Sequence, residues 1–316
     1  MSPAVTVAVV SWNTRDLLLR CLRSLEPEVE AGRASVWVVD NQSSDGSAEA
    51  ARAEAPWATV IEARENLGFG RAVNLVARES DSDWIAAANA DVALEPGALE
   101  ALLAAGSDGR VAAVAPRLLL PGGEVQHSVY RFPTLPHTFL LELGLSRLVP
   151  GLGDRLLLLD FWNPEKAREV DWAIGAFVLF RRQAFDQVGG FDERQWMYAE
   201  DLDLGWSLHD AGWTTRYEPR ARVLHEESAA AQVAFGEQKV AKSMAATYTV
   251  LVRRRGLART WATAAVHVVG AGGRYAWNAL LTPIAPRRRW WKNLYWVWLW
   301  AHREGLRSRS TLLRGR

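Results

Sequence analysis

The stretch "TVAVVSWNTRDLLLRCLRSLEPEVEAGRASVWVVDN", Thr6 to Asn41, alternates a strand pattern with a helix pattern. The valine-rich runs at 6–12 and 35–41 are typical of buried strands, and the segment between them carries leucines at helical spacing. Asn13 or Thr14 is expected to cap this helix. A helix between two buried strands predicts a βαβ unit with parallel strands.

The same alternation continues over about the first 220 residues. It predicts an α/β fold class: a Rossmann-like, mostly parallel central sheet with helices on both faces. The segment 121–159 is rich in proline and glycine turns, so we expect an irregular excursion there. From Ala229 onward the pattern is helical. Further strands are expected at 59–63, 83–91, within 170–185 and at 214–219.

Small polar residues follow three of the predicted strands. The carboxyl ends of parallel strands lie at one edge of a sheet, where ligands of α/β proteins bind. We therefore expect these residues to line a ligand-binding crevice. They are Ser11, Asn13, Asp40, Asn41, Asn89 and Asp91.

Length and composition fit one large domain with an appendage, or two domains. The chain has 316 residues, of which 49% are hydrophobic and 23% charged. The single cysteine, Cys21, excludes an internal disulfide and lies in a helical pattern, which favours a small core residue over a nucleophile. No basic region precedes the first strand, so we expect no signal peptide and a reducing, cytoplasmic compartment.

The C-terminal region differs from the rest of the chain in charge. Residues 253–316 contain 14 Lys and Arg and one acidic residue, and seven of the 16 tryptophans lie between Trp261 and Trp300. Its apolar runs are too short to span a bilayer. Interfacial helices on an anionic membrane surface fit this composition. The alternatives are a helical cap on the body and a homodimer surface; nucleic acid binding has no recognisable motif here.

Four stretches in order resemble family 2 glycosyltransferases, which are inverting nucleotide-sugar enzymes of the GT-A fold. They are "VVSWN", "VVDNQSSDGS", "NLGFGRAVN" with "NADV", and "GGFDERQWMYAEDLDLGW" with a later "LH". The resemblance covers about residues 5–228. It implies a catalytic domain at 1–228 and leaves 229–316 as a helical, basic extension. The segments "ENLGFGRAVN" and "MYAEDLDL" are most similar to the rhamnosyltransferase branch of the family, and this resemblance implies a dTDP-rhamnose donor.

The resemblance implies a divalent cation, Mg²⁺ or Mn²⁺, held by Asp91 and His225. Hard cations prefer carboxylate oxygens, and the cation neutralises the donor diphosphate. In this chain the motif is Asn89-Ala90-Asp91, so an amide replaces the second carboxylate of the family pattern. On spacing alone, a hydrogen-bonded loop histidine is the favoured explanation of His225, and the resemblance reverses that preference.

Donor binding is expected from the first half of the chain. Asp40 matches the family aspartate that accepts a hydrogen bond from the pyrimidine base, although strand-end aspartates also shape turns. In "NLGFGRAVN" the glycines allow a ligand to approach the backbone closely. A helix is expected to start directly after them, and its free N–H groups favour an anion. Asn66, Gly68 and Arg71 are the candidate donor contacts of this turn, while Asn74 is a structural candidate.

The stretch "MYAEDLDLGW", residues 197–206, sets carboxylates among apolar residues. Helical spacing places Asp201 on one face with Leu204, Leu208 and Ala211. The resemblance implies that Asp201 is the catalytic base, with Glu200 orienting it or meeting the acceptor. The alternative is an acid-rich helix start, which favours a helix N-terminus without any chemistry.

On the acceptor side, Trp172 falls where the family binds the acceptor, although a core tryptophan is the commoner explanation. The sequence thus predicts a metal-dependent hexosyltransferase that moves a sugar from a dTDP- or UDP-sugar to a lipid-linked or cell-wall glycan. We expect it at the inner face of the cell membrane. Two rivals are a nucleotidyltransferase, disfavoured because "SWNTRD" lacks a glycine-rich loop, and a non-catalytic nucleotide-sugar binding scaffold.

Overall fold

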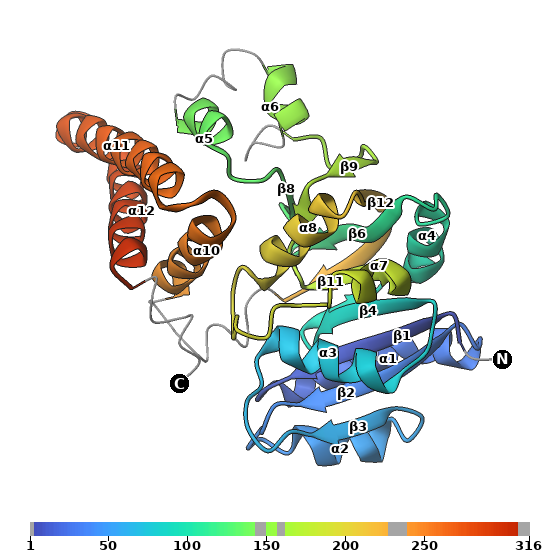
Figure 1. Cartoon of the computed structure of the whole chain (residues 1–316). Coiled ribbons are helices and arrows are strands. Elements are labelled where there is room, and N and C mark those ends of the chain that lie inside the picture. Colours follow the sequence, from blue (N-terminus) through green and yellow to red (C-terminus); the bar gives the residue numbers. More distant parts are fainter. Residues whose placement is uncertain (1–2, 143–149, 157–161, 227–238, 309–316) are drawn as a thin grey trace. The chain divides into compact units, whose positions relative to one another are not determined.

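The computed structural model describes residues 3–142, 150–156, 162–226 and 239–308 (Figure 1). The strands are β1 (Val5–Ser11), β2 (Ala34–Asp40), β3 (Thr59–Glu62), β4 (Trp84–Asn89), β5 (Val92–Leu94), β6 (Val111–Leu119), β7 (Val125–Gln126), β8 (Val129–Tyr130), β9 (Arg168–Val170), β10 (Trp172–Ala173), β11 (Phe177–Arg181) and β12 (Thr214–His225). The helices are α1 (Arg15–Glu30), α2 (Ser47–Glu54), α3 (Phe69–Glu79), α4 (Ala98–Ala105), α5 (Leu135–Glu142), α6 (Pro150–Leu156), α7 (Arg182–Gln187), α8 (Glu200–Asp210), α10 (Lys239–Arg255), α11 (Leu257–Leu281) and α12 (Arg288–Ser308).

The central sheet has the strand order β3-β2-β1-β4-β11-β6-β12-β5. The pairs β2–β3, β1–β2, β1–β4 and β6–β12 are parallel, whereas β11 runs antiparallel to both β4 and β6. Two short strands, β8 and β10, pair separately. The predicted α/β class with a mostly parallel sheet is therefore confirmed.

Helices cover both faces of this sheet because successive strand residues point to opposite sides. On one face, Val5, Val7 and Val9 of β1 pack in a single core with the buried leucines of α1 and α4. On the other face, α3 contacts β1 and β2. There Phe185 of α7 meets Phe180 and Phe191 at centroid distances of 5.7 and 5.8 Å. The expectation of helices on both faces is thus confirmed (Figure 1).

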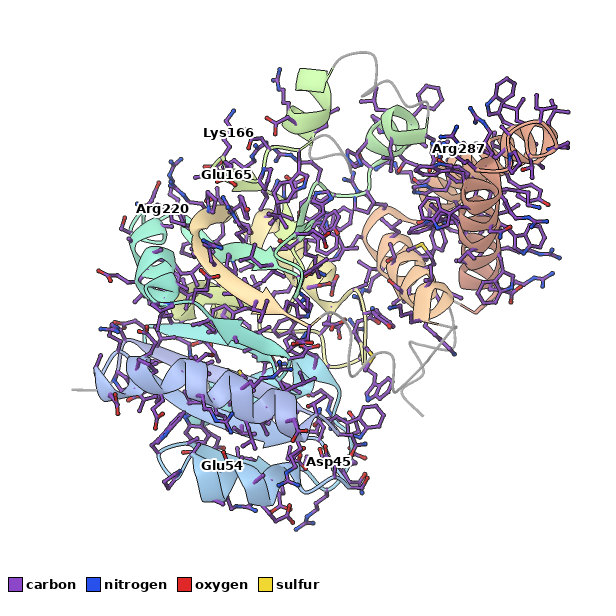
Figure 2. All side chains as sticks on the ribbon, turned by 180° about the vertical axis from the view of Figure 1, so that it is seen from behind. Asp45, Glu54, Glu165, Lys166, Arg220 and Arg287 are labelled. Atoms are coloured by element: carbon purple, nitrogen blue, oxygen red, sulfur yellow. The ribbon has the colours of Figure 1, made fainter. Side chains whose placement is uncertain are left out.

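Helix α1 is capped differently from the prediction. Thr14 occupies the N-cap position, but its side chain makes no capping hydrogen bond. Instead the Asp45 carboxylate accepts from the backbone N–H of Arg15 at 2.9 Å and from that of Ser47 at 3.1 Å. One carboxylate therefore serves the first turns of two helices. Figure 2 shows Asp45 before the start of α2 and Glu54 at its end.

Two expectations about irregular segments need correction. The segment 121–159 contains β7, β8, α5 and α6 in its described part, whereas 143–149 and 157–159 lie outside the described residues. The last strand extends beyond 214–219 and reaches His225. It does so through a register shift between Glu218 and Arg222, which keeps β12 paired with β6.

The chain divides into two compact units. The first comprises residues 1–130, 163–196 and 200–233; the second comprises 131–162, 197–199 and 234–316. The expected boundary between residues 228 and 229 lies outside the described residues. The second unit also takes in α5 and α6, which the predicted boundaries placed in the first domain.

A buried polar network lies within the second unit. Glu142, the last residue of α5, contacts His267 Nδ1 at 2.8 Å and Arg274 Nη1 at 2.7 Å, both on α11. Tyr248 of α10 bonds to His302 Nδ1 of α12 at 2.7 Å. Burial lowers the pKa of His302 to about 3, so this ring is neutral at physiological pH. Such directional bonds fix how α5 packs on α11 and α10 on α12.

None of the described helices combines the length and apolar character needed to cross a bilayer.

Gly205 of α8 allows that helix to approach β10 closely. A Cβ atom at Gly205 would lie 2.6 Å from Trp172 Cβ and 3.3 Å from the Asp171 carbonyl oxygen. We expect Gly205→Ala to lower the free energy of unfolding by about 1–3 kcal/mol, because the contact atoms are not the ends of flexible side chains.

Gly273→Ala in α11 is the control, since a Cβ there has nothing within 4 Å. It should stabilise α11 by roughly 0.5–1 kcal/mol, the usual gain from replacing a helical glycine. Thermal unfolding followed by circular dichroism measures both variants. Equal effects of the two substitutions would contradict the close packing of α8 on β10.

Candidate active site

The carboxyl ends of β1, β2 and β4 lie side by side. Ser11 pairs with Asp40 in the sheet register, and the backbone N–H of Asn41 donates to the Ser11 carbonyl at 2.8 Å. Val10 pairs with Asn89, the last residue of β4. The sheet thus brings together the polar residues that the sequence placed after three different strands.

Asp40 presents one free carboxylate oxygen at this edge. The side chain is 3% exposed, and its Oδ2 accepts from the Ser43 N–H at 2.9 Å. Its Oδ1 is buried and has no hydrogen-bond partner among the described residues. A buried carboxylate oxygen without a partner is costly, so this atom is suited to accept a hydrogen bond from a ligand.

The asparagines near these strand ends hold loops in place. Asn13, with φ of 51°, accepts from the Ser44 N–H through Oδ1 at 2.8 Å. Asn41 is buried and joins the end of β2 to the glycine turn before α3, because its Oδ1 accepts from the Leu67 N–H at 3.3 Å. Ser11 Oγ lies 3.1 Å from Thr14 Oγ1 and is fully buried.

The glycine turn contacts the loop that precedes α8. Gly68 has φ of 77°, and a Cβ atom there would collide with the backbone carbonyl of Trp196. Asn66 Oδ1 accepts from the Gly68 N–H at 3.0 Å, and the Asn66 carbonyl accepts from Trp196 Nε1 at 3.1 Å. These contacts shape the turn and tie it to the segment leading into α8.

Two other candidates of this region have structural partners. Asn74 bonds both backbone groups of Phe191, at 2.8 and 2.9 Å, as expected of a structural residue. The side chain of Arg71 is 39% exposed and pairs with Glu65 at 3.4 Å. The role of Arg71 as a donor contact stays a prediction.

Asp91 and His225 face each other in the first unit. Asp91 Oδ1 lies 3.4 Å from His225 Nε2, and both residues are less than 10% exposed. Gln126 Oε1 lies 2.7 Å from His225 Nδ1 and accepts its hydrogen. His225 Nε2 therefore faces the Asp91 carboxylate, and an imidazole nitrogen and a carboxylate oxygen are both metal ligands, so the two atoms could share a cation.

This pair fits part of a divalent cation site. Within the described residues no group of three or more His, Cys, Asp or Glu side chains could hold a metal ion. One carboxylate and one imidazole leave most of the coordination sphere to waters and ligand oxygens. Such a site would bind a cation mainly together with an anionic ligand.

Cys21 behaves as the core residue that the sequence predicted. It is fully buried in α1, and its Sγ contacts the Asn89 carbonyl at 4.0 Å. Burial, with a smaller contribution from the charge of Asp91, raises the pKa of this thiol to about 12. A thiol held in that form is a poor nucleophile.

Helix α8 begins at the two candidate carboxylates. Asp201 Oδ2 accepts from the Gly175 N–H at 3.0 Å, and Asp201 Oδ1 accepts from the Leu202 N–H at 2.8 Å. The next residue, Ala176, accepts from the Asn89 N–H at 2.9 Å. One short segment, 175–176, thus links the Asp201 carboxylate to the end of β4, two residues before Asp91.

Burial acts on both carboxylates of this pair. It raises the pKa of Asp201 to about 6, against the lowering effect of its backbone hydrogen bonds. It raises the pKa of Glu200 to about 8, and the charge of Asp201 adds to this shift. At neutral pH the pair therefore holds one proton, and the larger upward shift favours Glu200 as its carrier beside Asp201 as a proton acceptor.

The apolar face of α8 is shorter than the spacing predicted. Leu204 and Leu208 are buried, but Ala211 follows the end of the helix and is exposed. Asp203 is likewise only 4% exposed. The helix is therefore covered on the side of Asp203 as well.

Trp172 packs on an aromatic neighbour beside α8. Its ring stacks on Tyr130 at a centroid distance of 4.7 Å and an interplanar angle of 22°. It is half-buried, and its Cβ lies against Gly205. Both the core explanation and a partly exposed acceptor platform remain compatible with this position.

Two residues that position the site were not predicted from the sequence. Gly175 orients Asp201, and its signal in the sequence was a glycine two residues before the strand at 177–181. Gln126 fixes the ring of His225 from a two-residue strand nearly a hundred positions away. No pattern in the sequence could have singled out Gln126.

The family model described as "Glycosyl transferase family 2" matches residues 6–189. An N-acetylglucosaminyl-diphospho-decaprenol L-rhamnosyltransferase of Mycobacterium tuberculosis is 35% identical over 244 residues, which cover 72% of this chain and 78% of that protein. A pre-mycofactocin glycosyltransferase of the same species is 37% identical over 146 residues, 46% of this chain and 27% of that protein.

Among solved structures, the mannosyltransferase PcManGT of Pyrobaculum calidifontis, in complex with GDP-Man and Mn²⁺, superposes with a TM-score of 0.61. It is 18% identical and covers 97% of this chain and 88% of that one. At that identity the likeness shows a shared fold.

The raised pKa of Glu200 makes stability depend on pH. The folded state holds this proton more tightly than the unfolded state does. The resulting contribution to the free energy of unfolding is therefore complete below pH 4.5 and is lost as pH rises through about 8. We expect Glu200→Gln, which cannot ionise, to gain melting temperature relative to the wild type between pH 5 and pH 9. The gain in melting temperature should be roughly 2–4 °C for each kcal/mol of difference in the free energy of unfolding.

Glu193→Gln is the control, since its hydrogen bond with Arg78 lowers the pKa of Glu193. Glu193 therefore stabilises the fold above its unfolded pKa and loses that effect only as pH falls through its folded pKa. Between pH 5 and pH 9 its difference from the wild type should stay nearly flat. A flat difference for Glu200→Gln as well would refute the buried, protonated carboxyl.

Proposed function

Since the chain belongs to glycosyl transferase family 2, we propose that it moves L-rhamnose from dTDP-rhamnose to a lipid-linked glycan acceptor. The enzyme class follows from the family, and the sugar and acceptor follow the rhamnosyltransferase of M. tuberculosis that the chain resembles over most of its length. The observation that carries the proposal is Asp201, whose carboxylate a backbone N–H holds beside the end of β4.

In this proposal Asp201 is the catalytic base. The acceptor hydroxyl oxygen attacks the anomeric carbon of the donor, and the bond from that carbon to the diphosphate oxygen breaks. The diphosphate leaves with the bonding electrons, Asp201 takes the hydroxyl proton, and the configuration of the carbon inverts. An aspartate whose pKa burial has raised to about 6 accepts a proton better at neutral pH than an ordinary aspartate does.

Glu200 complements Asp201 as a neutral neighbour. Its Oε2 is buried and has no hydrogen-bond partner among the described residues. Because its pKa is raised to about 8, it carries a proton that it can donate to an acceptor hydroxyl or sugar oxygen. We assign it to orienting the acceptor beside Asp201.

The strand-end edge provides the donor site in this proposal. The unpartnered Oδ1 of Asp40 would accept the ring N–H of thymine or uracil. Asp91 and His225 would hold Mg²⁺ or Mn²⁺ together with the diphosphate. When bound, the cation neutralises the diphosphate and helps it to leave. Trp172 remains the candidate acceptor contact.

The alternatives differ in what they leave unexplained. A non-catalytic scaffold would have no need of a buried and a half-buried carboxylate side by side with different raised pKa values. A UDP-hexose donor would use the same edge, and it differs from dTDP-rhamnose in the sugar and the base. Comparing the two donors decides that point.

We further propose that the enzyme acts at the inner face of the membrane. Residues 253–316 carry a large basic excess. Trp277 on α11, Trp290 on α12 and Ile284 between the two helices are 58%, 62% and 81% exposed. Basic residues beside exposed tryptophans favour an anionic bilayer surface.

Asp201→Asn tests the assignment of the base. The amide cannot accept the proton, so the rate of sugar transfer should fall about 10²–10⁴-fold while donor binding is retained. Transfer is measured by release of dTDP, and donor binding by calorimetry. Asp210→Asn, at the exposed end of the same helix, should leave both unchanged. A variant Asp201→Asn that transfers rhamnose at the wild-type rate would remove Asp201 from the mechanism.

A thermal-shift experiment tests the cation site and the donor together. We expect dTDP-rhamnose with Mn²⁺ to stabilise the protein more than either alone, and more than a UDP-hexose with Mn²⁺. At a hundredfold excess over Kd the gain is about 2.7 kcal/mol. Asp91→Asn and His225→Ala should each remove the Mn²⁺-dependent part.

Glu226→Gln, whose carboxylate pairs with Arg20 at 2.8 Å, is the neighbouring control and should keep the Mn²⁺-dependent part. An Mn²⁺ effect that survives in both Asp91→Asn and His225→Ala would place the cation elsewhere.

A further inference from the structure

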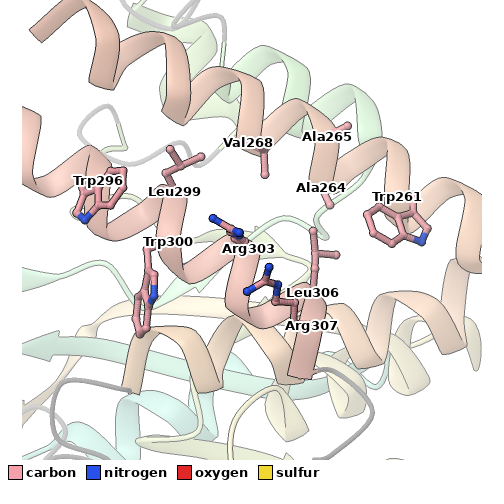
Figure 3. Close-up of a pocket in the computed structure, with 10 residues that line it drawn as sticks. All are labelled: Trp261, Ala264, Ala265, Val268, Trp296, Leu299, Trp300, Arg303, Leu306 and Arg307. Carbon is pink, nitrogen blue, oxygen red and sulfur yellow. The ribbon is translucent and has the colours of Figure 1, made fainter. Parts of the chain in front are cut away.

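A groove of about 610 Å³ lies between α11 and α12 in the second unit. Figure 3 shows Trp296 and Trp300 at one end and Trp261 at the other. Val268 of α11 and Arg303 of α12 point into the space between the helices. The volume is in the range of pockets that enclose a single small ligand, about 300–1,000 Å³.

The groove is apolar and open to solvent. Trp261, Trp296 and Trp300 are 47%, 54% and 38% exposed, although each carries a large apolar ring. Exposed apolar surface of this kind marks a binding site more often than a free surface. An occupant that fills the groove must therefore present a largely apolar chain.

Among the described residues that line the groove, the charged side chains are arginines. Arg303 and Arg307 are four residues apart on α12, so they lie on the same side of the helix. Arg303 makes no ion pair within the described ranges, and Arg307 contacts Glu304 at 3.2 Å. Guanidinium groups bind phosphate oxygens through paired hydrogen bonds. The occupant thus combines an apolar chain with a phosphate headgroup.

We propose that this groove binds the isoprenoid chain and diphosphate of the lipid that carries the acceptor glycan. The inference rests on the proposed function, which requires a lipid-linked acceptor. A bilayer surface would be a different ligand. Trp277 and Trp290, which are exposed and do not line the groove, are the residues that would contact it. A concave slot of this size encloses one chain, with the arginines at its headgroup.

The binding test uses farnesyl diphosphate as the probe and tryptophan fluorescence as the readout. Farnesyl diphosphate should quench fluorescence saturably, whereas inorganic diphosphate and farnesol, which are head and chain alone, should bind at least about tenfold more weakly. Ala265→Phe fills the groove and Arg303→Ala removes its free cation; each should weaken farnesyl diphosphate binding about tenfold or more.

The matched controls lie on the same helices outside the groove. Ala276→Phe on α11 and Arg289→Ala on α12 alter exposed positions and should leave farnesyl diphosphate binding unchanged. Equal losses in the control and groove variants would overturn the proposal. So would a loss of binding to phosphatidylglycerol vesicles in the groove variants that matches their loss of farnesyl diphosphate, because the groove would then be bilayer surface.

Kinetics with the full chain separate this inference from the proposed function. Acceptors with a long and a short isoprenoid chain are compared. Ala265→Phe should raise the KM for the long-chain acceptor relative to the KM for the short-chain acceptor about tenfold. A wild type that transfers rhamnose while Ala265→Phe leaves this ratio unchanged would overturn the groove and keep the function. A wild type that binds farnesyl diphosphate but transfers no sugar would overturn the function alone.

Discussion

The hydrogen bond from the Gly175 N–H to Asp201 Oδ2 is the constraint on which the site depends. It joins the first turn of α8 to the segment 175–176, which in turn bonds to the end of β4. Without this bond, the loop before α8 would set the position of the carboxylate, and the sheet would not. Because the sheet also sets the positions of Asp40 and Asp91, this one contact gives all three carboxylates a common frame.

The alternation of strands and helices was predictable because burial on a two-sided sheet leaves a strong mark on a sequence. Runs such as 6–12 and 83–91 are largely apolar between their polar ends, and β1 and β4 coincide with them to within two residues. Residues that follow parallel strands must meet at one edge, so the neighbourhood of Asp40, Asn41 and Asn89 was also predictable.

The remaining features depend on contacts between distant residues, which local patterns do not carry. Gln126 lies 99 positions from His225, and Asp45 caps α1 from 30 positions away. The prolines and glycines of 121–159 led to the prediction of an irregular segment. In the structure α5 forms there, and its last residue, Glu142, contacts His267 of α11. Where tertiary contacts decide a conformation, propensity and spacing give the wrong element or none.

Backbone strain coincides with the candidate site. Asn13, Gln42, Tyr198 and Ala199 all have φ between 51° and 68°, which is unfavourable for residues other than glycine. The first two follow β1 and β2, and the last two precede Glu200 directly. Such conformations persist only where surrounding bonds enforce them, as Asn13 Oδ1 does with the Ser44 N–H. The strained residues therefore fix the strand-end loops and the entry to α8 before any ligand arrives, which lowers the ordering cost of binding.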